Sequence, residues 1–600
     1  MCGMVGEYSA SPDESWVKLE LERHRFRGPD HTEVIRVNSN LILGANRLAM
    51  VDRHPRSNQP MINRDSNSVL TFNGEIYNFK ILKRQIESEG VQFNTESDTE
   101  VLLMGLEVFG IEFIKDLNGM YSFVYFDATK NKLFFSRDRL GKKPLYLKYS
   151  KSGLKWSSNF SSFLEKRNQM NRGGLESYLR FGYSIDPTTF IENVTSLEPG
   201  TVLEVSLNSM QVPKSVPHPK RSKSSSSFRS ILTSAVEARS NKEEVIGISL
   251  SGGLDSTLIA IICKDLGLNV RSYSAHWSNS DKPRYNEDAR AAFEISKILK
   301  IEHTNVEMLS PEELPLKLQN YVRAMEEPNN NATGVSMMDL YSKISEDGIR
   351  LTLTGDGADE LFAGYDRYRL AKRFPKVFNL DSKLWIETPS NDFGKYMSRM
   401  ISSQFSATNF SFWSSWQSIF SGKEIKKILG QLTNSNANLL FSGVLPISAQ
   451  FSTELIQKQD LQVWIGMESN RRLDRVSMFH SIEARSPFLD NRILDYAIPF
   501  LEKSELISKL KLFRVEFPEL FKLPVLTKKA GFISPIGHWL RGNPEYVSEQ
   551  IKFLSDFCGF RKPFLQELLR SPSSGNFENL KKLWSLLVLS VWMQIYNVSL

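Results

Sequence analysis

The chain has 600 residues, of which 41% are apolar and 24% charged, as in ordinary globular proteins, and its length predicts at least two domains. Its net charge of +7 is small for this length and its basic residues cluster only at 218–223, so we expect neither nucleic acid nor a membrane as a partner. Three widely spaced cysteines exclude a disulfide framework and, with no leader or spanning segment in view, predict a cytoplasmic protein.

Residues 1–205 predict a domain rich in β-strands. Short apolar runs alternate with turn signals, for example at 68–78 and 120–138, and the second of these predicts a hairpin with DATKNK as its turn. Segments 78–90 and 98–110 carry apolar residues at three- and four-residue spacing, which predicts helices. We therefore expect an α+β domain built on layered antiparallel sheets with helices.

A change of pattern divides the chain. Over residues 206–227, prolines, a basic run and four serines replace the apolar rhythm, which predicts a linker. Residues 228–600 then form the second domain, where strands alternate with helices before mostly helical patterns begin near residue 372. This alternation predicts an α/β parallel sheet with ligands at the carboxyl ends of its strands. The alternating segments are 243–250, 257–267, 270–277, 286–300 and 350–362.

The segment SLSGGLDST, residues 249–257, lies between a predicted strand and a predicted helix. Its glycines let the backbone approach an anion, and the helix N-terminus favours phosphate. It lacks the spacing and the Gly-Lys-Ser/Thr ending of a Walker A loop, and a lone SGG is usually a simple turn. The whole segment resembles the pyrophosphate-binding loop of N-type ATP pyrophosphatases, which split ATP between its α- and β-phosphates.

A second glycine-rich turn, TGDGADELF at 354–362, follows another predicted strand. Asp255 in the first loop would repel a triphosphate unless a cation lay between them, and Mg²⁺ is the usual cation. Two acidic turns at two strand ends favour a shared metal site with Asp255 and Asp359 as ligands. The plainer interpretation is a pair of turns with solvated acids.

Longer motifs of the second domain resemble the synthetase domain of glutamine-hydrolysing asparagine synthetases. They are SGGLDS, EEP at 326–328, TGDGADELFAGYDRY, DRVSMFHSIEARSPFLD at 474–490 and KKAGFISPIGHWL at 528–540. In that family ATP activates a carboxylate as an acyl-adenylate, pyrophosphate leaves, and ammonia forms the amide. The resemblance implies ATP contacts at Leu250, Ser251, Gly252, Gly253, Asp255, Ser256, Ala275, Thr354 and Gly355.

The same resemblance implies two catalytic side chains. Lys529 would stabilise developing charge at the reacting carbonyl, and Asp356 stands where many asparagine synthetases have a glutamate that assists at the intermediate. The shorter side chain of Asp356 leaves the identity of the acceptor open. The plainer interpretations are a solvated lysine and a turn acid.

Cys2 is the candidate nucleophile for the release of ammonia. If Met1 is removed, the thiol stands on the first residue, where the α-amino group, with a pKa of about 7.7 to 8.0, can accept its proton. No separate histidine is then needed. The plainer interpretation is an incidental cysteine near a frayed terminus.

Motifs of the first domain resemble the glutaminase domain of the same family, a class II glutamine amidotransferase of the N-terminal nucleophile type. They are MCGMVG, RGPD at 27–30, NRLAMVD at 46–52, FNGEIYN at 72–78, SDTE at 97–100, NGMYSFVYFD and SRDRLGKKPLY at 136–146. One departure is Phe26, where the family usually has histidine before RGPD, and we expect local repacking there.

This second resemblance implies a glutamine site. Asn73 and the Gly74 amide would form the oxyanion hole, Arg47 would pair with the α-carboxylate, and Asp98 with Glu75 would hold the α-ammonium group. Taken singly, each is as well explained as a surface charge, or for Asp98 as a helix N-cap. The implied glutamine-binding set is Arg47, Leu48, Ala49, Met50, Val51, Asn73, Gly74, Glu75 and Asp98.

Together these patterns predict an ATP-dependent amidotransferase that uses Mg²⁺, glutamine and a carboxylate acceptor, with aspartate as the default acceptor and ammonia passing internally. A sugar acid or a secondary metabolite is the alternative acceptor. A β-lactam-synthetase-like cyclase would have no use for Cys2, and an inactive regulatory or binding protein on this scaffold is the remaining hypothesis. The sequence does not decide whether a homodimer forms.

Overall fold

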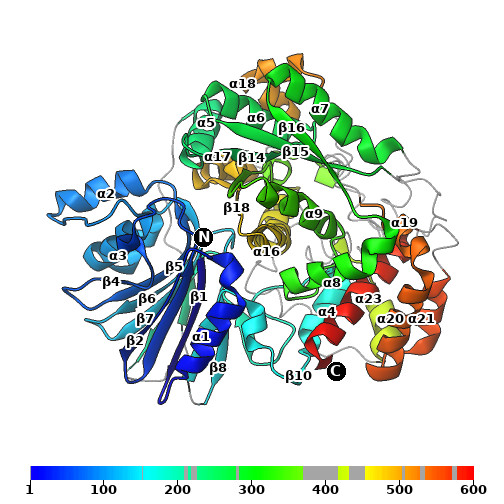
Figure 1. Ribbon diagram of the computed structural model, residues 1–600, viewed down its shortest axis with the longest axis horizontal. Coiled ribbons are helices and arrows are strands. Elements are labelled where there is room, and N and C mark those ends of the chain that lie inside the picture. The colour runs from blue at the N-terminus through cyan, green and yellow to red at the C-terminus, as the bar shows by residue number, and fades with distance from the viewer. Residues whose placement is uncertain are drawn as a thin grey trace.

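The structure is a computed structural model in which two regions of different architecture lie side by side (Figure 1). Antiparallel sheets with helices on their faces form the N-terminal region, and a parallel sheet surrounded by helices forms the rest. The predicted fold class is thereby confirmed. The residues that the structure describes are 2–151, 153–207, 214–217, 226–278, 283–365, 367–368, 417–430, 453–502, 507–526, 534–570 and 577–600.

Two six-stranded sheets form the N-terminal domain, and every pairing within them is antiparallel. The first contains β1 (Cys2–Ser9), β2 (His31–Asn38), β3 (Leu41–Arg47), β8 (Tyr146–Ser150), β9 (Gly153–Ser157) and β11 (Val194–Ser196). The second contains β4 (Met61–Ile62), β5 (Val69–Ile76), β6 (Gly119–Asp127), β7 (Lys132–Arg137), β12 (Thr201–Ser206) and β13 (Lys214–Pro217). The strand orders are β11-β8-β9-β1-β3-β2 and β13-β12-β7-β6-β5-β4. β13 lies within the segment expected to be a linker and extends the second sheet beyond β12.

The two sheets face each other across a core of alternating apolar residues, which includes Trp156 from the first sheet and Phe135 from the second. Helix α1 (Glu14–Arg23) covers the outer face of the first sheet through Val17 and Leu21. Helices α2 (Phe79–Ser88) and α3 (Asp98–Phe109) pack against the second sheet. Both were expected, as was the hairpin of β6 and β7, whereas the weakly amphipathic α1 was not.

The strand order of the parallel sheet in the second domain changes direction at one strand. The sheet consists of β14 (Ile246–Ser249), β15 (Val270–His276), β16 (Glu302–Glu307), β17 (Leu351–Leu353) and β18 (Glu483–Arg485), in the order β16-β15-β14-β17-β18. The strands on either side of β14 are reached in opposite directions, and ligands bind at such a switch point. The neighbouring helices are α5 (Phe228–Ala238), α6 (Leu254–Asp265), α7 (Glu287–Leu299), α8 (Leu314–Met325), α9 (Thr333–Glu346) and α10 (Ala358–Leu361).

Helices make up most of the remaining described chain. The long apolar helix α23 (Phe577–Tyr596) is buried at the centre of the largest core cluster, and β19 (Val598–Ser599) after it pairs with β10 (Asn168–Gln169). The others are α4 (Arg172–Phe181), α14 (Gly422–Leu429), α15 (Thr453–Gln459), the π-helical η8 (Asp460–Ser469), α16 (Asn470–Phe479), α17 (Asn491–Glu502), α18 (Lys509–Glu516), α19 (Ile536–Gly542), α20 (Pro544–Phe557) and α21 (Lys562–Leu569). Short 3₁₀ turns are η1 (Arg25–Arg27), η2 (Pro55–Ser57), η3 (Gly110–Asp116), η4 (Phe160–Phe163), η5 (Pro283–Asn286), η6 (Pro311–Glu313), η9 (Pro487–Leu489) and η10 (Pro518–Lys522). Within the described ranges, no helix has the length and apolar character needed to cross a membrane.

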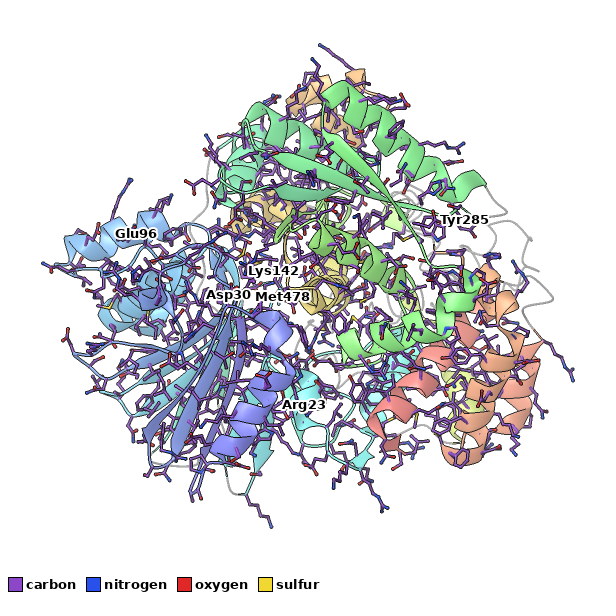
Figure 2. The ribbon with its side chains drawn as sticks, viewed as in Figure 1. Arg23, Asp30, Glu96, Lys142, Tyr285 and Met478 are labelled. Carbon is purple, nitrogen blue, oxygen red and sulfur yellow. The ribbon has the colours of Figure 1, made fainter. Side chains whose placement is uncertain are left out.

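The two domains meet through buried polar contacts near the middle of the molecule, where Figure 2 labels Lys142. Lys142 Nζ donates to the Leu489 carbonyl at 2.8 Å, and Asn118 Nδ2 donates to both carboxylate oxygens of Asp490 at 3.0 and 3.1 Å. Buried polar groups hold a fixed geometry when each has a partner. These contacts therefore set the relative positions of the two sites described next.

Candidate functional site

Cys2 lies at the start of β1, in the interior of the N-terminal domain. Its backbone N–H donates to Asn73 Oδ1 at 3.2 Å, and Gln59 Nε2 donates to its Sγ at 3.5 Å. Burial raises the pKa of the thiol, although a backbone hydrogen bond from Leu48 acts in the opposite sense. A thiol that resists ionisation needs a nearby base in order to act as a nucleophile.

Asn73 and Gly74 lie on β5, where the Asn73 side chain reaches the backbone of Cys2. Asn73 Nδ2 is buried and, among the described residues, has no hydrogen-bond partner. Gly74 has φ +155°, and a Cβ there would overlap the Met120 carbonyl oxygen of the neighbouring strand. A buried donor without an acceptor is costly, and such a group is satisfied when a ligand supplies a negative oxygen.

Arg47 ends β3 directly opposite Cys2 in the strand register. Its guanidinium donates to Asn58 Oδ1 at 2.8 Å and to the carbonyls of His54 and Asp52, so it fixes the loop that follows. That loop contains the predicted residues 48–51. Asp30 of the RGPD motif holds the same loop by accepting from its Ala49 N–H at 2.8 Å.

Glu75 and Asp98, the predicted ammonium ligands, lie beside Asn73 and are both buried. Asp98 Oδ2 accepts from the Ile76 N–H at 2.9 Å, and Glu75 forms an ion pair of 3.1 Å with Arg485 of the second domain. Burial raises the pKa of Asp98 to about 6 and that of Glu75 to about 8. The N-cap of α3 is Ser97, not Asp98, so the helix-cap interpretation of Asp98 is wrong.

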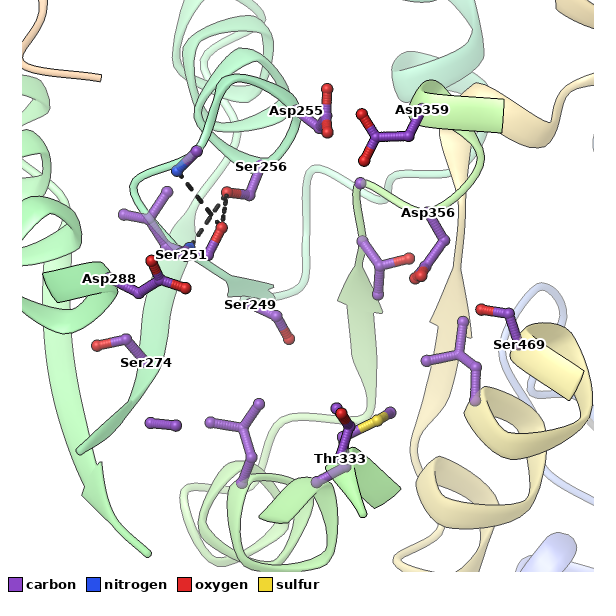
Figure 3. A pocket seen from close by; sticks show the side chains of 18 of the residues that line it. Ser249, Ser251, Asp255, Ser256, Ser274, Asp288, Thr333, Asp356, Asp359 and Ser469 are labelled. Atoms are coloured by element: carbon purple, nitrogen blue, oxygen red, sulfur yellow. Dashed lines mark hydrogen bonds between the residues drawn. The ribbon is translucent and has the colours of Figure 1, made fainter. Parts of the chain in front are cut away.

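The residues predicted to bind ATP lie around a cavity of about 510 Å³ at the carboxyl ends of β14, β15 and β17, which is called the nucleotide cavity below. Figure 3 shows Asp255 and Asp359 facing each other, with Ser251 and Ser256 on one side and Asp356 on the other. Lining residues that the sequence predicts are Leu250, Ser251, Gly253, Asp255, Ser256, Ala275, Thr354, Gly355, Asp356 and Asp359. Gly252 belongs to the same loop but does not line the cavity, and Lys529 lies outside the described residues.

The loop between β14 and α6 is held by its own polar groups. The Ser251 N–H donates to Ser256 Oγ at 3.1 Å, and the Gly253 N–H to Ser251 Oγ at 3.4 Å (Figure 3). Gly252 has φ +70°, and a Cβ there would lie 2.5 Å from Ala291 Cβ of α7. The loop thus stays close to the N-terminus of the twelve-residue helix α6, which favours an anion in the cavity.

Lys509 on α18 is a charged residue of this cavity for which the sequence analysis assigns no role. Its Nζ lies 2.9 Å from Asp255 Oδ2 and also forms an ion pair with Asp359 Oδ1. The two predicted metal ligands therefore converge on a single cation. A lone lysine in a helix carries no motif that could have indicated this position.

On the other side of the cavity, Arg472 of α16 lies among polar groups. Its Nε donates to Glu468 Oε1 at 2.7 Å, whereas Nη1 has the Met337 sulfur at 2.8 Å as its recorded partner. Despite burial, the pKa of Arg472 is raised by Glu468 and further by Asp356. A thioether is a weak acceptor, so Nη1 can readily exchange it for an oxygen anion.

A second, much smaller cavity of about 10 Å³ is lined by residues of both domains. Leu473 lines both this cavity and the nucleotide cavity. Tyr77, two residues beyond Glu75, also lines the smaller cavity. The sequence analysis assigns no residue to the space between the sites.

Phe26, the residue before the RGPD motif, packs against the second domain. Its ring centroid lies 5.5 Å from that of Phe479, and its carbonyl accepts from Ser481 Oγ at 2.7 Å. Arg27 beside it forms a buried ion pair with Asp474 at 2.9 Å. An aromatic contact with the second domain thus occupies the position where the resemblance would place histidine.

Residues 227–594 match the model of the asparagine synthase family, and residues 1–215 match that of the glutamine amidotransferase domain. The chain belongs to the asparagine synthase family. The resemblance stated from the motifs is thereby confirmed over nearly the whole length. This member of the family is an ATP-dependent ligase that uses glutamine to form an amide.

Curated proteins from several different organisms are similar to this chain. Asparagine synthetase [glutamine-hydrolyzing] 1 of Bacillus subtilis is 26% identical, with 99% of this chain and 97% of that protein aligned. Asparagine synthetase [glutamine-hydrolyzing] 2 of Oryza sativa is 30% identical over 61% of this chain and 60% of that protein. Amidase chyE of Penicillium rubens is 26% identical over 84% and 81%.

Proposed function

We propose that this protein is a glutamine-hydrolysing asparagine synthetase, in which ammonia released at Cys2 amidates an aspartate side chain activated by ATP. The observation that carries the proposal is that a small cavity at the domain contact is lined by Tyr77, two residues beyond Glu75, and shares Leu473 with the large cavity at the strand ends. Neutral ammonia is nucleophilic, whereas ammonium is not, so an internal passage that excludes water keeps it reactive.

The glutamine half-reaction uses the residues around Cys2. After removal of Met1, the α-amino group accepts the thiol proton, the thiolate attacks the glutamine amide carbon, and the same proton leaves with ammonia. Asn73 Nδ2, which has no recorded partner within the described chain, and the Gly74 N–H would hold the oxyanion. Water then hydrolyses the thioester to glutamate and restores the thiol.

Binding of glutamine in one orientation requires groups of opposite charge at its two ends. Arg47 would pair with the α-carboxylate and Asp98, with Glu75, would hold the α-ammonium group, while residues 48–51 form the wall between them. The buried position of both acids supports this, because burial raises the pKa of each carboxyl and a cationic ligand would favour its charged form.

The synthetase half-reaction would take place in the large cavity. A carboxylate oxygen of the acceptor attacks the α-phosphorus of ATP, the bond to the β-phosphate oxygen breaks, and pyrophosphate leaves toward the loop at 251–256. Ammonia then attacks the acyl-adenylate and AMP leaves. On this proposal Lys529 stabilises charge at the reacting carbonyl and Asp356 assists at the intermediate.

The two carboxylates beside the phosphate loop fit Mg²⁺. Asp255 and Asp359 supply oxygen ligands of the kind that Mg²⁺ prefers, and both already share one cation, Lys509 Nζ. When bound there, Mg²⁺ would offset the charge of the triphosphate. Lys509 would then supply a positive charge to the departing pyrophosphate.

The acceptor is proposed to be aspartate because Arg472 gives the cavity a cation in addition to Lys509. Arg472 and Asp356 both line the cavity, and Nη1 of Arg472 can bind a second carboxylate of the acceptor while the first reacts. On this proposal Asp356, and Glu468 that pairs with Arg472, would hold the α-ammonium group. We further propose that the protein acts in the cytoplasm.

The test measures pyrophosphate release with ATP, Mg²⁺ and glutamine, with and without aspartate, in the wild type and in Cys2→Ala. Aspartate is expected to stimulate release, and Cys2→Ala is expected to make asparagine with ammonium but not with glutamine. If glutamine hydrolysis is lost but aspartate has no effect, the acceptor is another carboxylate. If no acceptor supports release, the proposal is wrong.

A further inference from the structure

Four buried charged side chains meet where the glutamine site contacts the synthetase domain. Arg485 Nη2 lies 3.1 Å from Glu75 Oε2, and Arg485 Nε lies 2.6 Å from Glu483 Oε1. Asp98 accepts from the N–H of Ile76, the residue after Glu75, and the charge of Glu483 adds to the effect of burial in raising the pKa of Asp98. One guanidinium from the second domain thus contacts an acid of the glutamine site directly.

The acids of this cluster respond differently to Arg485. Despite burial, the pKa of Glu483 is lowered to about 2 by Arg485, whereas burial raises the pKa values of Glu75 and Asp98. Glu75 of the first domain and Glu483 of the second share the guanidinium of Arg485. On the proposed function, the ammonium group of glutamine would add a positive charge beside Glu75 and Asp98.

The backbone of Arg485 reaches the nucleotide cavity. Arg485 ends β18 and is in register with Leu353 at the end of β17. Its carbonyl accepts from the N–H of Thr354 at 3.0 Å, and the hydroxyls of Ser486 and Thr354 lie 3.0 Å apart. Thr354 lines the nucleotide cavity. Arg485 therefore contacts the glutamine site with its side chain and the nucleotide site with its main chain.

The direction of the guanidinium is fixed from a third side. Arg485 Nη1 donates to the Arg239 carbonyl at 2.9 Å, and Arg239 is itself bound to Asp490 at 2.7 Å. The side chain therefore has limited freedom to follow Glu75 independently of the backbone. A shift of β18 at Thr354 would be transmitted to the ion pair with Glu75.

We propose that Arg485 is a positioning residue that couples nucleotide binding to glutamine binding. This inference rests on the proposed function. Contacts of the nucleotide with Thr354 fix the end of β17, β18 follows through the Arg485 carbonyl, and the guanidinium then holds Glu75 where it receives the ammonium of glutamine. A second ligand that meets an already ordered site loses less conformational freedom on binding.

Coupling of this kind is reciprocal. If ATP strengthens glutamine binding by a given factor, glutamine must strengthen ATP binding by the same factor. We expect a factor of about 5 or more, at the lower end of the usual range. A role confined to folding would weaken the binding of both ligands but leave the coupling factor unchanged, so a change in the factor distinguishes positioning from stability.

The experiment uses the full chain with Cys2→Ala, which binds glutamine without consuming it. Isothermal titration gives the dissociation constant of glutamine with and without ATP and Mg²⁺, and that of ATP with and without glutamine, in the absence of acceptor. Arg485→Lys is expected to keep the charge but lose the fork that joins Glu75 to Glu483, so both factors fall toward 1. Arg139→Lys, at a second interdomain ion pair of 2.8 Å with Asp495, is the matched control and should keep the factor.

Glu75→Gln provides an independent variant in case Arg485→Lys does not fold. It leaves the Arg485–Glu483 pair in place, and it should weaken glutamine binding and abolish the coupling factor while ATP still binds. The inference is overturned if both ligands bind the parent protein independently, or if the factor survives in Arg485→Lys or in Glu75→Gln. The proposed function fails differently, through absence of glutamine hydrolysis or of acceptor-dependent pyrophosphate release.

Discussion

The glutamine site and the nucleotide cavity differ in how they are built. The proposed glutamine site consists mainly of side chains on paired antiparallel strands and is almost wholly buried. The nucleotide cavity lies at the ends of parallel strands, is about 510 Å³ in volume, and is lined by loops and by helices such as α16 and α18. A rigid strand site suits one small substrate, whereas a larger cavity between loops and helices can hold ATP and an acceptor together.

Asp359→Asn should impair the activity of the nucleotide cavity without changing that of the glutamine site. It removes one of two carboxylates beside the phosphates, and loss of a metal ligand of this kind costs several kcal/mol, or roughly 10³-fold in rate. Acceptor-dependent pyrophosphate release should fall by about that factor, while glutamine hydrolysis without ATP is unchanged. Lys511→Ala, exposed on the same helix as Lys509, is the control and should leave both activities intact. Unchanged pyrophosphate release in Asp359→Asn would exclude the proposed metal site.

Asn73→Ala should impair the glutamine site without changing the activity of the nucleotide cavity. Removal of one oxyanion donor typically lowers the rate about 10²- to 10³-fold. We expect a loss of that size in glutamine-dependent amide formation, with ammonium-dependent formation unaffected, measured in the same preparation. A loss in both would mean that Asn73 supports the fold, since its Oδ1 also holds the backbone of Cys2.

The sequence predicted the two sites unequally. Motifs such as SGGLDS and FNGEIYN place loops and strands, and a short segment that carries its own backbone geometry is recognisable from the chain alone. Lys509 and Arg472 come from helices whose sequences show only amphipathic spacing, so their approach to the cavity depends on tertiary packing. Arg485 lies inside a recognised motif, but its contact with Glu75 spans two domains and follows only from the assembled structure.

The same limit applies to secondary structure. Helices α2 and α3 were predicted from apolar spacing, whereas α1 was not, because Val17 and Leu21 stand among charged residues over a short segment. β18 is only three residues long and gains its place by pairing with β17, which no local pattern indicates. The small cavity that shares Leu473 with the nucleotide cavity is likewise a property of packing.

Arg472→Gln separates the two proposed ligands of the nucleotide cavity, because it should weaken binding of the acceptor and leave binding of ATP unchanged. A hydrogen bond to a charged group is worth about 1.5 to 3 kcal/mol, which corresponds to roughly 10- to 100-fold in binding. The KM for aspartate should rise by that amount with ammonium as nitrogen donor, while the KM for ATP and the KM for glutamine stay within about twofold. A rise in the KM for ATP instead would place Arg472 at the nucleotide.

The smallest expected effect is a pH dependence confined to the glutamine site. Burial raises the pKa of Asp98 to about 6, and Glu75, Glu483 and Arg485 are the charged groups beside it. Below that pH Asp98 is protonated and cannot hold an ammonium group, so the KM for glutamine should rise as pH falls, by at most about tenfold per unit. The KM for ATP should not follow the same curve.

The sign of the stability effect is opposite to that of binding. Because the pKa of Asp98 is raised above its ordinary value of 3.8, its protonation favours the folded protein, and this contribution is complete below about pH 3.8 and lost as pH rises through about 6. Asp98→Asn should therefore stabilise the chain at pH 7.5 in thermal unfolding while it weakens glutamine binding. If Asp98→Asn instead lowers both the stability of the chain and its affinity for glutamine, Asp98 serves mainly to accept the hydrogen bond from the Ile76 N–H. The carboxylate of Asp98 would then not be a ligand for the ammonium group of glutamine.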